Sequence, residues 1–308
     1  MGRLVTLMKD LALAIDVGAT KIAVGLVARD GTMVVREDIA SQVKSLDQLN
    51  HSLADVIKRV MVQSNLHVVG AGIGSAGPID RIQGRINPVN ISHWVDFSLV
   101  DFVREVSGIS QVRLIGDASA LAYAEFELGA GIGAKNLLGI VISTGIGGGV
   151  VLNGQFHEGR TGNAGFIGHS VVVADGKLYA CGQRGCVEAY SSGTNMARDF
   201  GVDNFEAVAL AARMGDPKAI AVVDEGAKKL AVGLLNSVAL MDIDTIVVGG
   251  GVMKAADIYW PVLQRHFTAQ MQLLNFPGKV ALKQATLGTD SGLVGAGLVG
   301  FISGEKGE

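Results

Sequence analysis

The sequence contains little cysteine, proline or charge, and each scarcity excludes a class of protein. Only 2 cysteines occur in 308 residues, too few for the disulfide framework of a secreted protein, so we expect an intracellular, cytoplasmic setting. Charged residues make up 18% of the chain and the net charge is −3, which gives no general attraction to nucleic acid or to an anionic membrane. No run of 18 uninterrupted apolar residues is present, so we expect no membrane span.

Glycine is abundant instead. The chain has 43 glycines, roughly 14% of its residues and about twice the usual share. With only 5 prolines these glycines do not form a low-complexity linker, and they cluster directly after apolar runs. This placement is typical of tight turns at which the backbone approaches another group. An apolar content of 49% indicates a well-buried α/β protein.

Apolar runs alternate with amphipathic stretches along the chain, as strands and helices do in an α/β fold. We predict strands at 11–15, 22–28, 32–38, 68–73, 112–116, 137–142, 150–156 and 245–250. We predict helices at 46–64, 118–129 and 204–240, and a final helix from about 290. A strand, a glycine turn and a returning strand occur at 11–28 and again from 137, so two α/β domains are expected. Their predicted limits are 1–117, a small N-terminal domain, and 118–289, a larger one; residues 290–308 can return to the first.

The two glycine turns, 16–21 and 143–149, are candidate phosphate sites. Turns without Cβ atoms let backbone N–H groups reach phosphate oxygens, and hydroxyl and lysine side chains add donors. Two ordinary hairpins with permissive turns are the alternative. A GxGxxG match at Gly72, Gly74 and Gly77 follows a strand, but Pro78 comes next and no helix opens, so we do not expect a dinucleotide site. No GxxxxGK[ST] string occurs, which excludes a P-loop.

Two further patterns carry chemistry. Asp117 stands at a strand-to-helix junction, where an Asp most often serves only as the N-cap of the helix. A carboxylate at the end of a buried strand also projects into a cleft, where a general base would belong. His169, Cys181, Cys186 and Glu188 lie within twenty residues, a weak metal signal because structural zinc usually takes four closely spaced ligands. Two buried thiols and a turn histidine are the alternative.

Several segments, in order along almost the whole chain, resemble motifs of the ROK family (repressors, open reading frames and sugar kinases) of the actin-like ATPase superfamily. They are AIDVGATK (14–21), INPVNISHW (86–94), LIGDASA (114–120), STGIGGGVVLNG (143–154), AGFIGH (164–169), CGQRGCVE (181–188) and IVVGGGV (246–252). In the same order they resemble the first phosphate motif, the sugar loop, the catalytic Asp motif, the second phosphate motif, two sugar- and zinc-associated motifs and the adenosine motif.

The resemblance implies an α/β, two-domain actin-like ATPase (ribonuclease H-like) fold with a central cleft. It also implies an ATP-dependent, magnesium-assisted transfer to a sugar hydroxyl, with Asp117 as the general base. The implied sugar contacts are Asn90, Asp117, Phe166, His169 and Glu188. The implied ATP contacts are Asp16, Gly18, Thr20, Lys21, Thr144, Gly145, Gly147, Gly250 and Gly251.

Four positions depart from the family pattern. Ala19 replaces a glycine, Gly116 replaces an Asn and Phe166 replaces a Glu, so two groups that bind sugar hydroxyls are missing. A phenyl ring favours an apolar or acyl substituent, since an unpaired polar group beside it is penalised. Some N-acetylmannosamine kinases of the family also vary at this Glu, and we therefore expect an N-acyl hexosamine. Tyr179 replaces a cysteine that binds zinc in the family pattern, which leaves His169, Cys181 and Cys186 as ligands. This set is one ligand short of a closed tetrahedral site, so the sequence does not predict bound Zn²⁺.

Three other functions compete with a sugar kinase that uses ATP. A sugar-responsive repressor of the family carries an added helix-turn-helix, for which the stretch before residue 11 leaves no room. A catalytically weak sugar-binding or regulatory protein is suggested by the missing Asn and Glu. A kinase that uses polyphosphate as donor is the third. By analogy we expect a homo-oligomer, a dimer, that binds neither nucleic acid nor membrane.

Overall fold

The structure is a computed structural model that describes residues 10–63, 66–88, 91, 93–274 and 278–302. The chain divides into two compact units. The first comprises Met1–Ala124, Glu158–Asn163 and Thr289–Glu308, and the second comprises Glu125–His157 and Ala164–Gly288. Helix α3 (Asp117–Leu128) therefore contributes residues to both.

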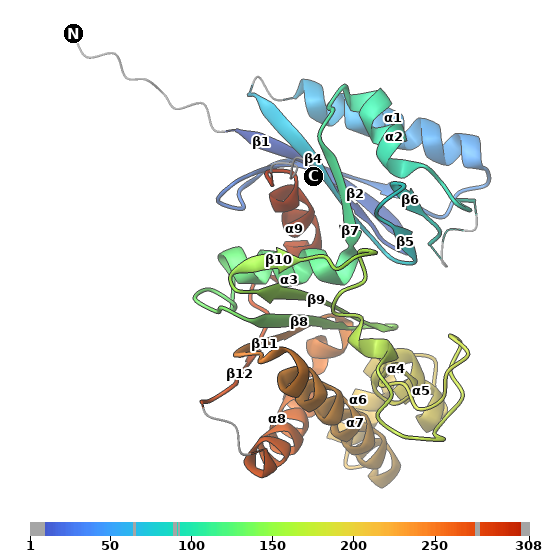
Figure 1. Ribbon diagram of the computed structural model, residues 1–308. Coiled ribbons are helices and arrows are strands. Elements are labelled where there is room, and N and C mark those ends of the chain that lie inside the picture. Colours follow the sequence, from blue (N-terminus) through green and yellow to red (C-terminus); the bar gives the residue numbers. More distant parts are fainter. Residues whose placement is uncertain (1–9, 64–65, 89–90, 92, 275–277, 303–308) are drawn as a thin grey trace. The chain divides into compact units, whose positions relative to one another are not determined.

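The first unit is built on a five-stranded sheet with the order β3-β2-β1-β4-β7. β1 (Leu11–Val17) pairs antiparallel with β2 (Lys21–Ala28), which pairs antiparallel with β3 (Met33–Ala40). β4 (Val68–Ser75) lies parallel to β1, and β7 (Val112–Gly116) lies parallel to β4. Helices α1 (Leu46–Val62) and α2 (Leu99–Ser107) cover one face of this sheet, and α9 (Ser291–Val299) covers the other (Figure 1). A small hairpin, β5 (Ile79–Asp80) and β6 (Arg85–Ile86), follows β4.

Glycines in β4 let α9 pack directly on the strand backbone. A methyl group at Gly72 would lie 1.8 Å from the carbonyl oxygen of Ala296, and one at Gly70 would lie 2.1 Å from that of Gly300. No real side chain fits at these distances, so the helix reaches the sheet only because both positions lack a Cβ atom. Gly72, the first glycine of the GxGxxG match, therefore serves helix packing.

The second unit repeats the strand order of the first, as β10-β9-β8-β11-β12. β8 (Leu137–Ile142), β9 (Ile146–Leu152) and β10 (Gln155–His157) form an antiparallel meander. β11 (Thr245–Gly249) lies parallel to β8, and β12 (Ala281–Gln284) lies parallel to β11. The strand, glycine turn and strand repeat that the sequence predicts is confirmed, because β1–β2 and β8–β9 occupy equivalent places in the two sheets.

The helices of the second unit lie mainly between β10 and β12 in sequence. They are α4 (Glu188–Ser191), α5 (Gly193–Phe200), α6 (Phe205–Arg213), α7 (Pro217–Met241) and α8 (Ala256–Leu273), with short 3₁₀ helices η1 (Ile167–His169) and η2 (Gly251–Ala255). A third 3₁₀ helix, η3 (Gly288–Asp290), follows β12 where the chain passes from the second unit to the first. α7 and α8 pack on one face of the sheet (Figure 1). In the part of the chain that the structure describes, no helix is both long and apolar enough to cross a membrane.

Two predicted elements need correction. The single helix expected over 204–240 is two helices, because Gly215 adopts a positive φ of 85° and Asp216 caps a new helix that opens with Pro217. The returning strand expected over 150–156 begins earlier, at Ile146, and is broken by the Asn153–Gly154 turn, whose positive φ values reverse the chain into β10. Helices α2, α4, α5 and α8 and strands β5, β6 and β12 were not predicted. Residue 64 of the helix expected over 46–64 lies outside the described residues.

Candidate functional site

In the first unit, two carboxylates stand at the same edge of the sheet. Asp117 follows β7 directly and opens α3, and its Oδ1 accepts from the backbone N–H of Ala118 at 2.7 Å. Protein atoms packed around this carboxyl disfavour its charged form and raise the pKa of Asp117. Solvent nevertheless reaches the side chain, which is exposed, so water screens part of that effect. The sequence prediction of a strand-to-helix carboxylate is confirmed in position; its role as base remains a prediction.

Asp16, near the end of β1, also has a perturbed pKa. Burial and then the charge of Asp117 raise the pKa of Asp16 to about 6, while Lys21 and Arg36 act in the opposite direction. A methyl group at Gly292, in the first turn of α9, would lie 3.0 Å from Oδ2 of Asp16. The carboxylate thus lies against a helix N-terminus that only a glycine leaves open.

Hydrogen bonds within the β1–β2 hairpin and from the residue that follows β3 hold the turn from residue 16 to residue 21. Gly18 donates its N–H to the carbonyl of Lys21 at 3.0 Å, and the carbonyl of Ala19 accepts from the hydroxyl of Ser41 at 2.8 Å. Ala19 is not among the residues with positive φ, so its backbone conformation does not require the glycine that the family pattern has there. Lys21 pairs with Asp38 at 3.0 Å, and Thr20 is exposed in the turn.

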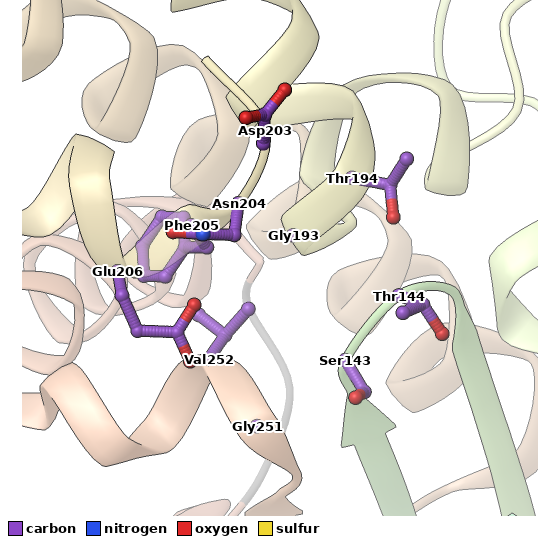
Figure 2. A pocket seen from close by; sticks show the side chains of 10 residues that line it. All are labelled: Ser143, Thr144, Gly193, Thr194, Asp203, Asn204, Phe205, Glu206, Gly251 and Val252. Atoms are coloured by element: carbon purple, nitrogen blue, oxygen red, sulfur yellow. The ribbon is translucent and has the colours of Figure 1, made fainter. Parts of the chain in front are cut away.

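In the second unit, the equivalent turn borders a pocket of about 140 Å³. The turn closes through the N–H of Ser143, which donates to the carbonyl of Gly145 at 2.8 Å. Figure 2 shows Ser143 and Thr144 on one side of the pocket and Glu206 and Val252 on the other. The lining residues are Ser143, Thr144, Gly193, Thr194, Asp203, Asn204, Phe205, Glu206, Gly251 and Val252.

Two glycines line this pocket, and a third, Gly250, directly precedes one of them. Gly193 and Gly251 approach Ser143, since added methyl groups would lie 2.8 Å from its carbonyl oxygen and 3.1 Å from its hydroxyl, respectively. Gly250 has φ 99° and ψ 179°, a conformation essentially limited to glycine, and its methyl would lie 2.4 Å from the carbonyl of Ile142. The backbone after β11 therefore lies against the end of β8 because these positions lack side chains.

A third cluster of side chains combines an aromatic ring, a histidine and a carboxylate. Phe166 stacks on His169 with ring centroids 4.7 Å apart and an interplanar angle of 22°. Phe166 is 47% exposed, although its ring packs closely on that of His169. Glu188, at the start of α4, is half-buried, and its Oε2 accepts from the backbone N–H of Ile146.

Tyr179 reaches the same carboxylate. Its hydroxyl donates to Oε1 of Glu188, and its ring lies 6.0 Å from that of His169, tilted by 47°. Burial and the hydrogen bond to Glu188 raise the pKa of the Tyr179 phenol, so the hydroxyl stays a neutral donor. The sequence indicated Tyr179 only as a missing metal ligand, and this hydrogen bond was not anticipated.

His169, Cys181 and Cys186 gather as possible metal ligands, with their ligand atoms all within 4.8 Å of one another. The two sulfurs lie 3.7 Å apart, which matches two thiolates on a tetrahedral zinc ion with Zn–S bonds of about 2.3 Å. Nδ1 of His169 is buried and has no hydrogen-bond partner among the described residues. Without a metal, burial and the neighbouring Cys181 raise the pKa of Cys186 to about 11. Three positions of a zinc site therefore fit, and Tyr179 does not supply the fourth.

The predicted site residues fall into groups that the structure defines unit by unit. The first unit carries Asp16, Gly18, Thr20, Lys21 and Asp117, and the second carries Thr144, Gly145, Gly147, Phe166, His169, Cys181, Cys186, Glu188, Gly250 and Gly251. Asn90 lies outside the described residues. Sequence reasoning missed the pocket residues that no local motif marks, which are Gly193, Thr194, Asp203, Asn204, Phe205 and Glu206. Ser143 and Val252 lie within the motif segments 143–154 and 246–252, although neither was named as a contact.

Comparison with known proteins decides the family. The model of the ROK family matches residues 12–299. This chain belongs to the ROK family. An N-acetylmannosamine kinase of Yersinia pestis (strain Pestoides F) is 35% identical over 295 residues, covering 93% of this chain and 97% of that protein.

Two solved structures extend the comparison. A ROK hexokinase from Thermus thermophilus superimposes with a TM-score of 0.86 at 32% identity, over 94% of this chain and 98% of the other. A ROK family glucokinase from Streptomyces griseus, solved with glucose and AMPPNP, gives a TM-score of 0.76 at 28% identity, over 94% and 99%. These likenesses confirm the predicted actin-like ATPase fold and the predicted enzyme class, a kinase with an alcohol group as acceptor.

Proposed function

We propose that this ROK protein transfers the terminal phosphoryl group of ATP to a hydroxyl of an N-acyl hexosamine, with Asp117 as the general base. The observation that carries the substrate class is the exposed ring of Phe166 stacked on His169, beside Glu188. The sugar kinases among its relatives support the reaction class, and the N-acetylmannosamine kinase supports the acyl substituent.

Asp117 suits a general base in position and in pKa. It follows a buried strand, is exposed and has a pKa raised above its ordinary value. A carboxylate with a raised pKa takes up a proton more readily, so it withdraws the hydroxyl proton more effectively as the phosphoryl group transfers. A positioned base of this kind is typically worth about 10² to 10⁴ in rate.

The pocket beside the β8–β9 turn supports a nucleotide donor rather than polyphosphate. Phe205 and Val252 offer apolar surface, and Asp203 and Glu206 offer carboxylates that can accept from hydroxyl or amino groups. Polyphosphate has no such donors, and the same two acids would repel it. Ser143 and Thr144, on the opposite side, supply hydroxyl donors suited to phosphate oxygens.

The proposed magnesium ion fits the carboxylate of Asp16. Mg²⁺ prefers oxygen ligands and keeps several waters, and a half-buried carboxylate with a pKa of about 6 gains from a nearby cation. When bound with ATP, the ion would neutralise charge on the phosphates. Lys21 in the neighbouring turn adds a positive charge. Zinc at His169, Cys181 and Cys186 remains a proposal, with three protein ligands.

Phe166, His169 and Glu188 form the proposed acceptor cluster, which would bind the sugar that accepts the phosphoryl group. Its polar side chains and its aromatic ring have separate roles. Glu188 and His169 can hydrogen-bond sugar hydroxyls, while Phe166 offers an apolar face to an acyl methyl group. The family's Glu at this position would bind a hydroxyl instead. A free hydroxyl placed against the phenyl ring would lose its hydrogen bonds to water, so bare hexoses are disfavoured.

A coupled ADP-release assay with Mg-ATP tests this function on glucose, mannose, fructose, N-acetylglucosamine and N-acetylmannosamine. We expect the strongest turnover on an N-acyl hexosamine, and a fall of at least 10²-fold in Asp117→Asn. Asp80→Asn, an exposed carboxylate of the same unit, is the control and keeps full activity. Sugar binding by calorimetry without any ADP release would favour the regulatory sugar-binding protein instead.

A further inference from the structure

We propose that Tyr179 is a positioning residue of the acceptor cluster. Its hydroxyl holds the carboxylate of Glu188 in the orientation that binds the sugar. This inference rests on the proposed function, in which Glu188 binds the sugar, and adds a residue that does not itself touch the substrate.

The carboxylate of Glu188 is fixed from two sides. Oε2 accepts from the N–H of Ile146 at the start of β9, and Oε1 accepts from the hydroxyl of Tyr179. Methyl groups at Gly145 and Gly168 would lie 3.1 Å and 2.9 Å from its oxygens, so the neighbouring backbone closes around it. A carboxylate has about four lone-pair positions, so each oxygen keeps one for a ligand after these two bonds form.

Of the two donors, only Tyr179 comes from a side chain that a substitution can remove. The N–H of Ile146 belongs to the strand backbone. Without the phenol, Oε1 would have no protein donor among the described residues, and the side chain would be free to rotate away from its ligand-binding position. Charge-assisted hydrogen bonds are roughly twice as strong as neutral ones, so this loss matters more than that of an ordinary contact.

Tyr179 is itself held rigidly by its own turn. Its N–H donates to the carbonyl of Gln183 at 2.8 Å, and its carbonyl accepts from the N–H of Gly182 at 2.9 Å. The side chain is half-buried against His169, the other polar group of the acceptor cluster. A rigid turn and a packed ring leave the hydroxyl little freedom, which is what a positioning group requires.

A second tyrosine, in α4, offers a matched control. The hydroxyl of Tyr190 accepts from the backbone N–H of Lys177 at 2.8 Å, two residues before Tyr179. Tyr190→Phe therefore removes a phenol that supports the loop of Tyr179 but has no hydrogen bond to Glu188. Tyr179→Phe removes the phenol that does, and leaves its ring in place.

The test compares sugar KM, ATP KM, kcat and the sugar Kd without ATP in both variants, with N-acetylmannosamine as the probe. For Tyr179→Phe we expect sugar KM and Kd to rise about 10- to 100-fold while ATP KM stays within about twofold. For Tyr190→Phe we expect sugar KM within about twofold of the wild type. In a Glu188→Ala background, adding Tyr179→Phe should change the sugar Kd no further, because the hydroxyl acts through the carboxylate.

Two results overturn the inference: equal losses in Tyr179→Phe and Tyr190→Phe, or an undiminished effect of Tyr179→Phe in the Glu188→Ala background. Failure of the proposed function looks different. If the wild type binds sugar but transfers no phosphate, the kinase assignment fails, while the Kd values still decide the role of Tyr179. If the protein binds no sugar at all, both proposals fall.

Discussion

Asp16 and Asp117 are electrostatically coupled across one edge of the first sheet. They stand at the ends of β1 and β7, two strands that flank β4, and the charge of Asp117 adds to burial in raising the pKa of Asp16 to about 6. The pKa of Asp117 is raised as well. Two carboxylates that are costly to ionise together mark a position where a cation or a transferred proton relieves the repulsion.

The first prediction is an acid limit on activity. Asp16 must be ionised to support a cation, and its pKa of about 6 lies far above the ordinary value of 3.8. We expect kcat/KM to fall as the pH drops through about 6, with the protonation of Asp117 acting in the same direction. Steady-state rates between pH 5 and 8, with melting temperatures to show that the fold persists, check this. A profile that stays flat down to pH 5 contradicts it.

The second prediction concerns stability. The folded-state pKa of Asp16 is above its unfolded value, so the folded protein holds this proton more tightly and loses stability as the pH rises from about 4 to 6. A shift of about two units corresponds to about 3 kcal/mol, an upper value for a half-buried group. Asp16→Asn should therefore stabilise the protein by about 1–3 kcal/mol at pH 8, and by much less at pH 4, while impairing activity.

Chemical denaturation of both proteins at pH 4 and pH 8 provides the measurement. Asp38→Asn, a nearby carboxylate with a lowered pKa, is the control and should lose stability at pH 8 rather than gain it. Equal unfolding free energies of wild type and Asp16→Asn at both pH values would show that Asp16 carries no such strain.

The third prediction concerns substrate choice. Phe166→Glu replaces the exposed ring on His169 with a hydrogen-bond acceptor, as in the family pattern. We expect the kcat/KM ratio of N-acetylmannosamine to mannose to fall about 10- to 100-fold. Phe166→Leu, which keeps an apolar side chain, should preserve most of the preference. An unchanged ratio in Phe166→Glu would mean that the acyl group binds elsewhere.

The fourth prediction compares two glycines with nearly equal φ. Gly250 (φ 99°) has no room for a methyl group, whereas Gly201 (φ 98°) has nothing within 4 Å of one. Gly201→Ala should cost only the backbone strain, about 1–2 kcal/mol. Gly250→Ala should cost clearly more, because the methyl group has no room and because ψ is 179° at Gly250 but 36° at Gly201. It should also raise the KM for ATP, because the pocket residues Gly251 and Val252 follow directly. Thermal unfolding and ATP kinetics measure both effects, and equal destabilisation by the two variants would contradict the account.

Local patterns of the sequence predicted much of the framework and several candidate residues. Leu49, Leu53, Val56, Ile57 and Val60 follow helical spacing and are all buried in α1. Strand lengths, glycine turns and the Asp at a strand-to-helix junction depend on neighbouring residues, so they can be read without tertiary contacts. The misplaced start of β9 had a local cause as well: its glycines resemble a turn in sequence but continue the strand.

Long-range packing decided the rest. The sequence by itself determined the repeated strand, glycine turn and strand units and the order of the motifs, because these depend on short-range periodicity. Only the tertiary structure joined α9 to β4 through Gly72, brought Glu206 to the pocket opposite Thr144, and placed the hydroxyl of Tyr179 on Glu188. Each of these contacts joins residues of different elements, so the distance between them depends on how those elements pack. No local sequence pattern encodes that packing.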